Sequence, residues 1–264
     1  MKKFLFLGIM GSVVFLNSCS SSNDETSVEP EKKLLLSKFT TIYYDNPSKP
    51  ETVDQTFEYN NKGEVIKILH KGLATTFEYI DGKPVKANFY NNKQELSYSS
   101  VFYYKGALLD KTQETYVNSL SRTTNYTYNT NGQLTNITSC MAGNCTDPGN
   151  TSYTYSGDNV STEIISTPGS SSYTYKEEYS YDNKLNPHTN TNKYLRILMG
   201  SPDIISKNNY IVDKSSTKTG TTWTAGETTT YTLEYNSAGL PVKATGMGSD
   251  GKLSVLHTYE YITQ

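Results

Sequence analysis

A short aromatic pattern recurs along most of the chain and limits what the chain can fold into. Two aromatic residues flank one other residue in TFEYNNKGEVIKI (56–68), TFEYIDGKPVKA (76–87) and YTYNTNGQLTNI (126–137). The second aromatic of each copy falls at positions 59, 79, 104, 128, 155, 181, 235 and 261. Most spacings are 20 to 27 residues, a period typical of repeat proteins. The step from 181 to 235 is 54 residues, which predicts a degenerate unit between positions 182 and 234.

Each copy of the pattern predicts one β-hairpin. Residues two apart in a strand share a face, so both aromatics of a pair lie on the same side. Turn formers follow each pair and include Gly63 and Gly132, which suit the positive φ of tight hairpin turns. An aliphatic-x-Lys strand completes the unit. Consecutive units therefore form an antiparallel meander of β-hairpins.

The predicted fold is all-β, with about 14 to 18 strands in one sheet. A sheet of this size twists and needs protected edges, which a barrel or a half-pipe provides. The paired aromatics are expected on the inner, concave face: Phe57, Tyr59, Phe77, Tyr79, Tyr126, Tyr128, Tyr153, Tyr155, Tyr179, Tyr181, Tyr235 and Tyr261. Thr, Glu and Lys recur on the opposite face, where a lipid-facing barrel needs apolar residues. We therefore expect a water-soluble barrel or half-pipe formed by a single β-repeat domain, residues 34–264.

The N-terminus has the features of an exported and lipidated protein. Lys2 and Lys3 precede a 13-residue stretch with almost no polarity, 4–16, which is the length of a signal-peptide core and shorter than the ~20 residues of a membrane-spanning helix. Leu16-Asn17-Ser18-Cys19 resembles the bacterial lipobox. We predict a lipoprotein signal peptide at 1–18, lipidation of Cys19 and a disordered polar tether at 19–33. The acidic, serine-rich start of the tether resembles a surface-export signal of Bacteroidota lipoproteins, which indicates an outer-membrane anchor facing the cell exterior; the periplasmic face is the alternative.

The repeated units resemble YD/RHS repeats, whose pattern is Tyr-Asp-x-x-Gly-Arg-Leu. Asn often replaces the Asp in this chain, and the Arg is missing. The whole chain is similar to a Bacteroidota lipoprotein family of unknown function described as having a porin-like β fold. The repeats at 56–185 and 233–261 carry this resemblance, together with the interruption YDNKLNPHTNTNKYLRILMGSPDIISKNNYIV (181–212). The resemblance implies a fold and a location, and no activity.

The interruption at 181–212 is the most distinctive stretch of the chain. Leu195, Leu198 and Met199 recur at helical spacing before Gly200 and Pro202, which predicts a short helix. We expect this segment to cover an end or edge of the barrel as a plug, and as a sharper alternative to frame a ligand pocket. The candidate ligand-facing residues are Tyr181, His188, Tyr194 and Trp223.

Catalytic motifs are absent from the sequence. No nucleophile elbow, His-Glu-x-x-His or P-loop occurs, and the three histidines are isolated. Glu177 and Glu178 are adjacent, so a strand directs them to opposite faces and they do not form a glycosidase pair. Asp182, Asn186 and His188 are too loosely spaced for a metal site. We expect no enzyme activity, no cofactor and no metal.

Cys140 and Cys145 are the two cysteines left after lipidation of Cys19. An even number of cysteines in an exported chain favours a disulfide, which here would close a loop around a Gly-Asn turn. A pair of free thiols is the alternative.

The charge balance narrows the range of partners. Removal of Lys2 and Lys3 with the signal peptide leaves 22 of 24 basic residues against 26 acidic ones, a net charge of −4. Phosphate binding needs a basic surface, so nucleic acid is an unfavoured partner. A tyrosine-lined barrel suits a glycan or a protein ligand, and the expected function is that of a monomeric, non-catalytic binding or scaffold module. The alternative is an enzyme acting on a glycan or cell-surface substrate near the 181–212 insertion.

Overall fold

The computed structural model describes residues 33–117, 120–141, 144–167 and 173–264. These residues belong to one compact unit, Lys32–Gln264. The predicted signal peptide, Cys19 and all but the last residue of the predicted tether lie outside the described residues.

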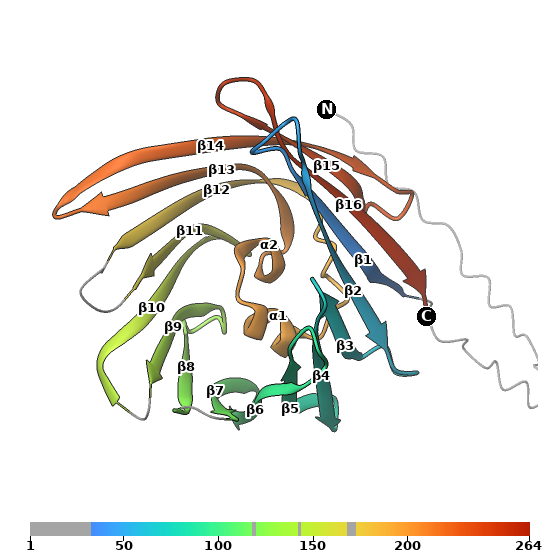
Figure 1. Cartoon of the computed structure of the whole chain (residues 1–264), viewed down its shortest axis with the longest axis vertical. Coiled ribbons are helices and arrows are strands. Elements are labelled where there is room, and N and C mark those ends of the chain that lie inside the picture. Colours follow the sequence, from blue (N-terminus) through green and yellow to red (C-terminus); the bar gives the residue numbers. More distant parts are fainter. Residues whose placement is uncertain (1–32, 118–119, 142–143, 168–172) are drawn as a thin grey trace, which may run out of the picture. The chain divides into compact units, whose positions relative to one another are not determined.

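The described chain forms a closed antiparallel barrel of sixteen strands (Figure 1). Each strand pairs with its neighbours in sequence, and β1 pairs with β16 to close the sheet. The prediction of an all-β meander with 14 to 18 strands is therefore confirmed. The strands are β1 (Leu34–Tyr43), β2 (Glu51–Tyr59), β3 (Val65–His70), β4 (Leu73–Ile80), β5 (Lys83–Tyr90), β6 (Leu96–Lys105), β7 (Leu108–Tyr116), β8 (Arg122–Tyr128), β9 (Leu134–Met141), β10 (Asn144–Ser156), β11 (Asn159–Ser166), β12 (Thr174–Leu185), β13 (Asn208–Thr219), β14 (Thr222–Tyr235), β15 (Pro241–Gly248) and β16 (Leu253–Thr263).

The aromatic pairs line the inside of the barrel, as the repeat predicts. The core cluster contains ten of the twelve aromatics expected there. The other two also point inward: the Tyr181 hydroxyl accepts a hydrogen bond from the Ser206 hydroxyl at 3.0 Å, and the Tyr235 hydroxyl donates to Asp182. The residue between the two aromatics faces outward, and Glu58, for example, is exposed.

The second tyrosine of a pair ties its strand to the preceding one. Its hydroxyl donates to a backbone oxygen near the start of that strand, as Tyr128 does to Leu109 at 2.8 Å. A register shift lies immediately before this tyrosine, for example between Thr127 and Tyr128, where a bulge redirects the side chain. The same bond occurs for Tyr59 to Leu36, Tyr79 to Val65, Tyr104 to Pro84, Tyr155 to Leu134 and Tyr261 to Pro241.

The insertion lies within the β12–β13 hairpin. Residues 186–207 replace its turn and fold into α1 (Lys193–Met199) and α2 (Pro202–Ile205), both inside the ring of strands (Figure 1). We call residues 186–207 the plug. The prediction of a degenerate unit between 182 and 234 is wrong, because the plug lengthens one hairpin and accounts for the spacing of 54 residues. The predicted short helix corresponds to α1.

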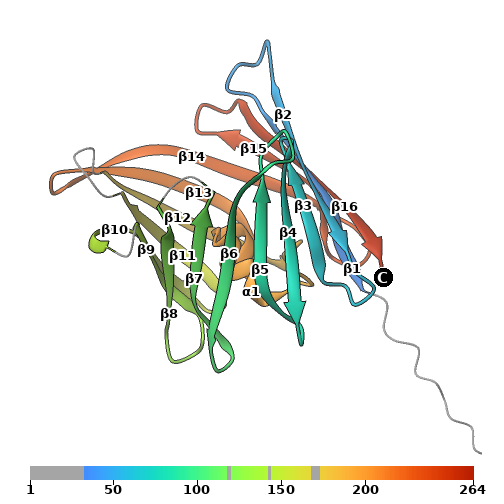
Figure 2. The same cartoon turned by 60° about the horizontal axis from the view of Figure 1, so that its bottom comes forward.

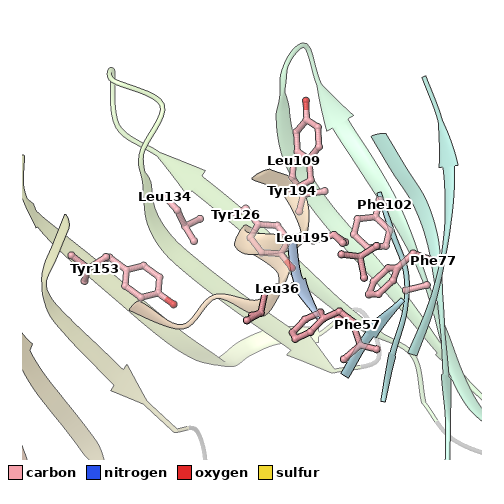
Figure 3. Packing of buried hydrophobic residues seen from close by; sticks show 14 residues of the cluster. Leu36, Phe57, Phe77, Phe102, Leu109, Tyr126, Leu134, Tyr153, Tyr194 and Leu195 are labelled. Carbon is pink, nitrogen blue, oxygen red and sulfur yellow. The ribbon is translucent and has the colours of Figure 1, made fainter. Parts of the chain in front are cut away.

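The plug completes the hydrophobic core. Tyr194 and Leu195 of α1 are 6% and 1% exposed, and they pack among barrel residues such as Phe102 and Leu109 (Figure 3). Figure 2 shows β3–β8 side by side as the wall next to α1. A barrel of sixteen strands is wider than its own side chains fill, so the helix supplies the missing apolar volume.

The outer face of the barrel carries charged pairs. The residue between two aromatics pairs with the lysine of the following strand: Glu58 with Lys67 at 3.1 Å and Glu234 with Lys243 at 2.8 Å. Where an aromatic takes the place of the glutamate, the Lys111 ammonium lies 4.9 Å from the centre of the Tyr103 ring. The repeat therefore encodes an apolar inner face and a polar outer face.

Candidate functional site

Buried polar contacts hold the plug in place. Asn186 is 1% exposed, its side-chain N–H donates to the backbone oxygen of Asp203, and its oxygen accepts from the backbone N–H of His188 at 2.7 Å. The Arg196 guanidinium donates to two backbone oxygens at the end of α2, at 2.7 and 2.8 Å. These bonds satisfy polar groups inside the barrel, so the plug has a defined position.

A cavity of about 250 Å³ lies between the plug and the wall formed by β1 and β13–β16. We call it the wall cavity. The plug contributes Asn186, Pro187, His188, Ser201 and Asp203, and the wall contributes Phe39, Thr41, Tyr43, Asn209, Tyr210, Tyr231, Leu233, Ala244, His257 and Tyr259. A lining of aromatic faces with a few polar groups is typical of small-molecule sites.

A continuous row of rings forms the wall of this cavity. Phe39 stacks on Tyr259 and on His257, with ring centres 5.1 and 5.2 Å apart. The Tyr231 ring is nearly parallel to His257 at 6.0 Å and meets Tyr210 edge-on at 4.9 Å. These separations are those of favourable aromatic pairs. The row comes from β1, β13, β14 and β16, so only the closed barrel assembles it.

Gly246 allows Tyr231 to lie flat against the wall. The two residues are paired across β14 and β15. A Cβ at position 246 would lie 2.8 Å from Tyr231 Cε1 and 2.6 Å from Val255 Cγ1, which is closer than side chains tolerate. A glycine inside a strand commonly marks such a close approach.

Two neutral histidines border the wall cavity. Burial and the nearby Arg196 lower the pKa of His188 to about 3, and burial lowers the pKa of His257 to about 4. His257 Nδ1 lies 3.0 Å from the Thr41 hydroxyl. His188 is 5% exposed, and its Nδ1 has no hydrogen-bond partner among the described residues. Because this nitrogen is itself buried, it is an unpaired polar atom of the interior and not a contact offered by the open cavity.

A pair of carboxyl groups on the inner wall of the barrel was not predicted from the sequence. Glu163 of β11 and Glu177 of β12 stand directly opposite each other, and the Tyr179 hydroxyl bonds to both. Burial and the charge of Glu177 raise the pKa of Glu163 to about 7. In the sequence, only the adjacent Glu177 and Glu178 were considered, and they do face opposite sides. Glu163 lies 14 residues before Glu177, and only the register of β11 and β12 shows that the two are opposite each other.

The structure separates the four predicted ligand-facing residues. His188 lines the wall cavity, and Tyr181 faces the interior beneath the plug. Tyr194 does not line it, since its ring packs edge-on against Tyr104 in the core, 4.9 Å away. Trp223 does not line the wall cavity either: it is 37% exposed on the β13–β14 hairpin, near two lysine ammonium groups.

The described residues show no metal-ligand cluster and no helix of membrane-spanning length. No group of three His, Cys, Asp or Glu side chains in the described ranges is arranged to hold a metal ion. Within the same ranges, every helix is too short or too polar to cross a membrane.

Cys140 and Cys145 are joined by a disulfide in the structure, with Cα atoms 4.9 Å apart. The bond links the end of β9 to the start of β10. This connection lies at the barrel end opposite the plug, so the disulfide is not part of the wall cavity.

Solved structures share this fold. A porin-like protein from Bacteroides uniformis ATCC 8492 aligns with 87% of this chain and 96% of its own, at 16% identity and a TM-score of 0.53. A porin-like protein from Bacteroides vulgatus ATCC 8482 aligns with 86% and 99%, at 12% identity and a TM-score of 0.54. No family model matches the chain, and no curated protein matches it. The chain therefore has a porin-like β-barrel fold.

Proposed function

We propose that the protein is a lipid-anchored outer-membrane module that binds one ring of a glycan in its wall cavity, without catalysis. The row of rings facing the plug is the observation that carries this proposal. Aromatic faces pack against the apolar faces of sugar rings, while the side-chain oxygens of Asp203 and Asn209, two residues that line the cavity, can accept hydrogen bonds from sugar hydroxyl groups. A volume of about 250 Å³ suits a ligand portion of one ring.

The proposed location rests on the N-terminal sequence and the outer face. The sequence before Cys19 resembles a lipobox, and the repeats resemble those of YD/RHS lipoproteins of Bacteroidota. The charged pairs on the outside of the barrel favour contact with water over contact with lipid. We propose a monomer on the cell exterior.

An enzyme acting on a glycan is the second candidate. His188, His257 and Asp203 border one cavity, and burial raises the pKa of the Asp203 carboxyl above its ordinary value. The low pKa values of His188 and His257, about 3 and about 4, make them weak proton acceptors and so favour the binding function. The alternative predicts turnover of a bound glycan, whereas the binding function predicts recovery of the glycan unchanged.

A glycan-array screen followed by calorimetric titration tests the proposal. Tyr231→Ala removes a wall ring and should weaken binding at least tenfold, about 1.4 kcal/mol. Tyr103→Ala, which removes an outward-facing ring, is the matched control and should bind like the natural protein. Mass spectrometry of the ligand after incubation separates binding from turnover. Absence of any glycan ligand, or equal affinity of the Tyr231 variant, would refute the site.

A further inference from the structure

A second cavity lies on the other side of the plug. Its volume is about 420 Å³, and it is bounded by β2–β8 and by Leu198 and Met199 of α1. It shares no lining residue with the wall cavity. We call it the apolar cavity, because Ile68, Leu73 and Phe77 line it together with the two plug residues.

One side of the apolar cavity is bordered by a stack of aromatic rings. The Phe89 and Tyr98 rings are 4.1 Å apart and inclined by 11°, and Tyr116 continues the stack at 4.7 Å and 27°. Phe89 and Tyr98 line the cavity directly. Stacked rings cover one another's faces, so Phe89 and Tyr98 add apolar ring edges to the cavity lining, and an aromatic ring of a ligand can contact these edges edge-to-face.

The polar end of the cavity is an ion pair with one unsatisfied side. Arg122 donates through Nε and Nη2 to the Glu114 carboxylate at 2.9 and 2.8 Å, and the Tyr116 hydroxyl donates to the same carboxylate at 2.7 Å. No described residue accepts from Arg122 Nη1. Glu114 already accepts three of the about four bonds that a carboxylate can accept, so the Arg122 Nη1 hydrogens make this pair mainly a hydrogen-bond donor toward a ligand.

The charge of this pair selects the kind of acceptor. Glu114 is 8% exposed and neutralises Arg122, so an arriving carboxylate would meet a buried negative charge beside the guanidinium. An uncharged carbonyl accepts the Nη1 hydrogens without that repulsion. We propose that the apolar cavity is a second binding site, for a flat, apolar, uncharged ring molecule that bears a carbonyl-type acceptor.

Nile red, a planar uncharged dye with a ring carbonyl, is the probe. Its emission should increase and shift to shorter wavelength on titration, saturating at one dye per protein. Leu73→Glu places a charge in the cavity at a residue that is 48% exposed, and should reduce the affinity at least tenfold. Ile80→Glu, on the same strand at 63% exposure and outside the cavity lining, is the matched control and should bind normally.

A second pair of variants distinguishes loss of the binding site from loss of the fold. Thr75→Trp fills the cavity, whereas Thr76→Trp puts the same ring on the next residue of β4, which faces outward. Only the Thr75→Trp variant should lose dye binding, and circular dichroism should show the same fold for both variants. Arg122→Gln should weaken Nile red, and anionic anilinonaphthalene sulfonate should bind the natural protein more weakly than Nile red. Non-saturable dye binding, equal effects of Thr75 and Thr76 variants, or tighter binding of the anionic dye would overturn the proposal.

Discussion

At the scale of the residue, the tyrosine hydroxyl that donates to the preceding strand is the repeated bond of the barrel. Six hydroxyls make this bond, and burial raises the pKa of each of these tyrosines. The phenols therefore remain protonated donors at any physiological pH. The bond is absent from the β12 and β14 units, where Tyr181 accepts from Ser206 of the plug and Tyr235 donates to the Asp182 carboxylate.

Tyr128→Phe tests the contribution of one such bond. The change removes the donor to Leu109 and leaves a partly buried carbonyl unpaired, so the free energy of unfolding should fall by about 1 kcal/mol. Urea denaturation followed by circular dichroism measures it. Tyr103→Phe, on the outer face, is the control and should change stability by less than about 0.5 kcal/mol. Equal effects at both positions would show that the inward hydroxyl is not a stabilising contact.

Two buried groups should give opposite pH dependences of stability. The pKa of His188 falls from about 6.5 to about 3 on folding, so its contribution is complete above pH 6.5 and is lost as the pH decreases. The pKa of Glu163 rises from 4.5 to about 7, so its contribution is present below pH 4.5 and is lost as the pH rises through 7. Between pH 7 and pH 5 each group changes the free energy of unfolding by about 2 kcal/mol: His188 lowers it and Glu163 raises it as the pH falls.

Urea unfolding at pH 7 and pH 5 separates these two effects. On going to pH 5, His188→Gln should lose about 2 kcal/mol less stability than the natural protein, and Glu163→Gln about 2 kcal/mol more. Each variant serves as the control for the other, because both replace a buried ionisable group by the same amide. Parallel pH profiles for all three proteins would contradict the assigned pKa directions.

At the scale of the element, the plug takes the place of a hairpin turn and fills the barrel. Leu195, at 1% exposure, is its most buried apolar side chain. Leu195→Ala should lower the free energy of unfolding by about 2 to 5 kcal/mol, since it leaves a void between α1 and the wall. Leu96→Ala, at a residue that is 45% exposed, is the control and should have a much smaller effect. A loss below 1 kcal/mol for Leu195→Ala would mean that the plug is loosely packed.

The β9–β10 connection carries the only disulfide among the described residues. Mass spectrometry of the exported protein without reduction should recover Cys140 and Cys145 in one linked peptide. The enclosed loop is short, so reduction should cost a modest ~1–3 kcal/mol of stability. Labelling of both thiols by a maleimide in the unreduced protein would show that the bond does not form.

The sequence predicted the repeated elements better than the irregular one. The alternation around Tyr59 and Tyr128 predicted hairpins with inward aromatics, because a strand has only two faces. The alternation of strand residues does not apply to the plug. Its helical spacing predicted α1, but its place inside a hairpin and its contacts with the wall depend on closure of the sheet. Among the residues that line the wall cavity, His188 was predicted because it lies in the distinctive 181–212 segment. Tyr231 and His257 were not predicted, because in the sequence they resemble every other repeat residue.

At the scale of the whole molecule, the distribution of side chains is the inverse of that expected for a pore in lipid. Aromatic rings and the plug occupy the interior, and ion pairs such as Glu78–Lys86, at 3.7 Å, lie outside. A lipid-facing barrel needs an apolar outer band about 25 Å tall. The porin-like fold thus encloses a packed core with cavities beside the plug, among them the wall cavity and the apolar cavity, and this arrangement favours the binding functions proposed for them.

Detergent phase partitioning tests this view of the whole molecule. In Triton X-114, the natural protein should enter the detergent phase through its lipid, because two acyl chains suffice for stable anchoring. Cys19→Ala removes the acylation site and should move the protein to the aqueous phase with its barrel folded. A control substitution in the predicted tether, Ser21→Ala, should leave the protein in the detergent phase. If the Cys19 variant stays with the detergent while folded, the barrel itself contacts lipid, and the inference drawn from its charged outer face fails.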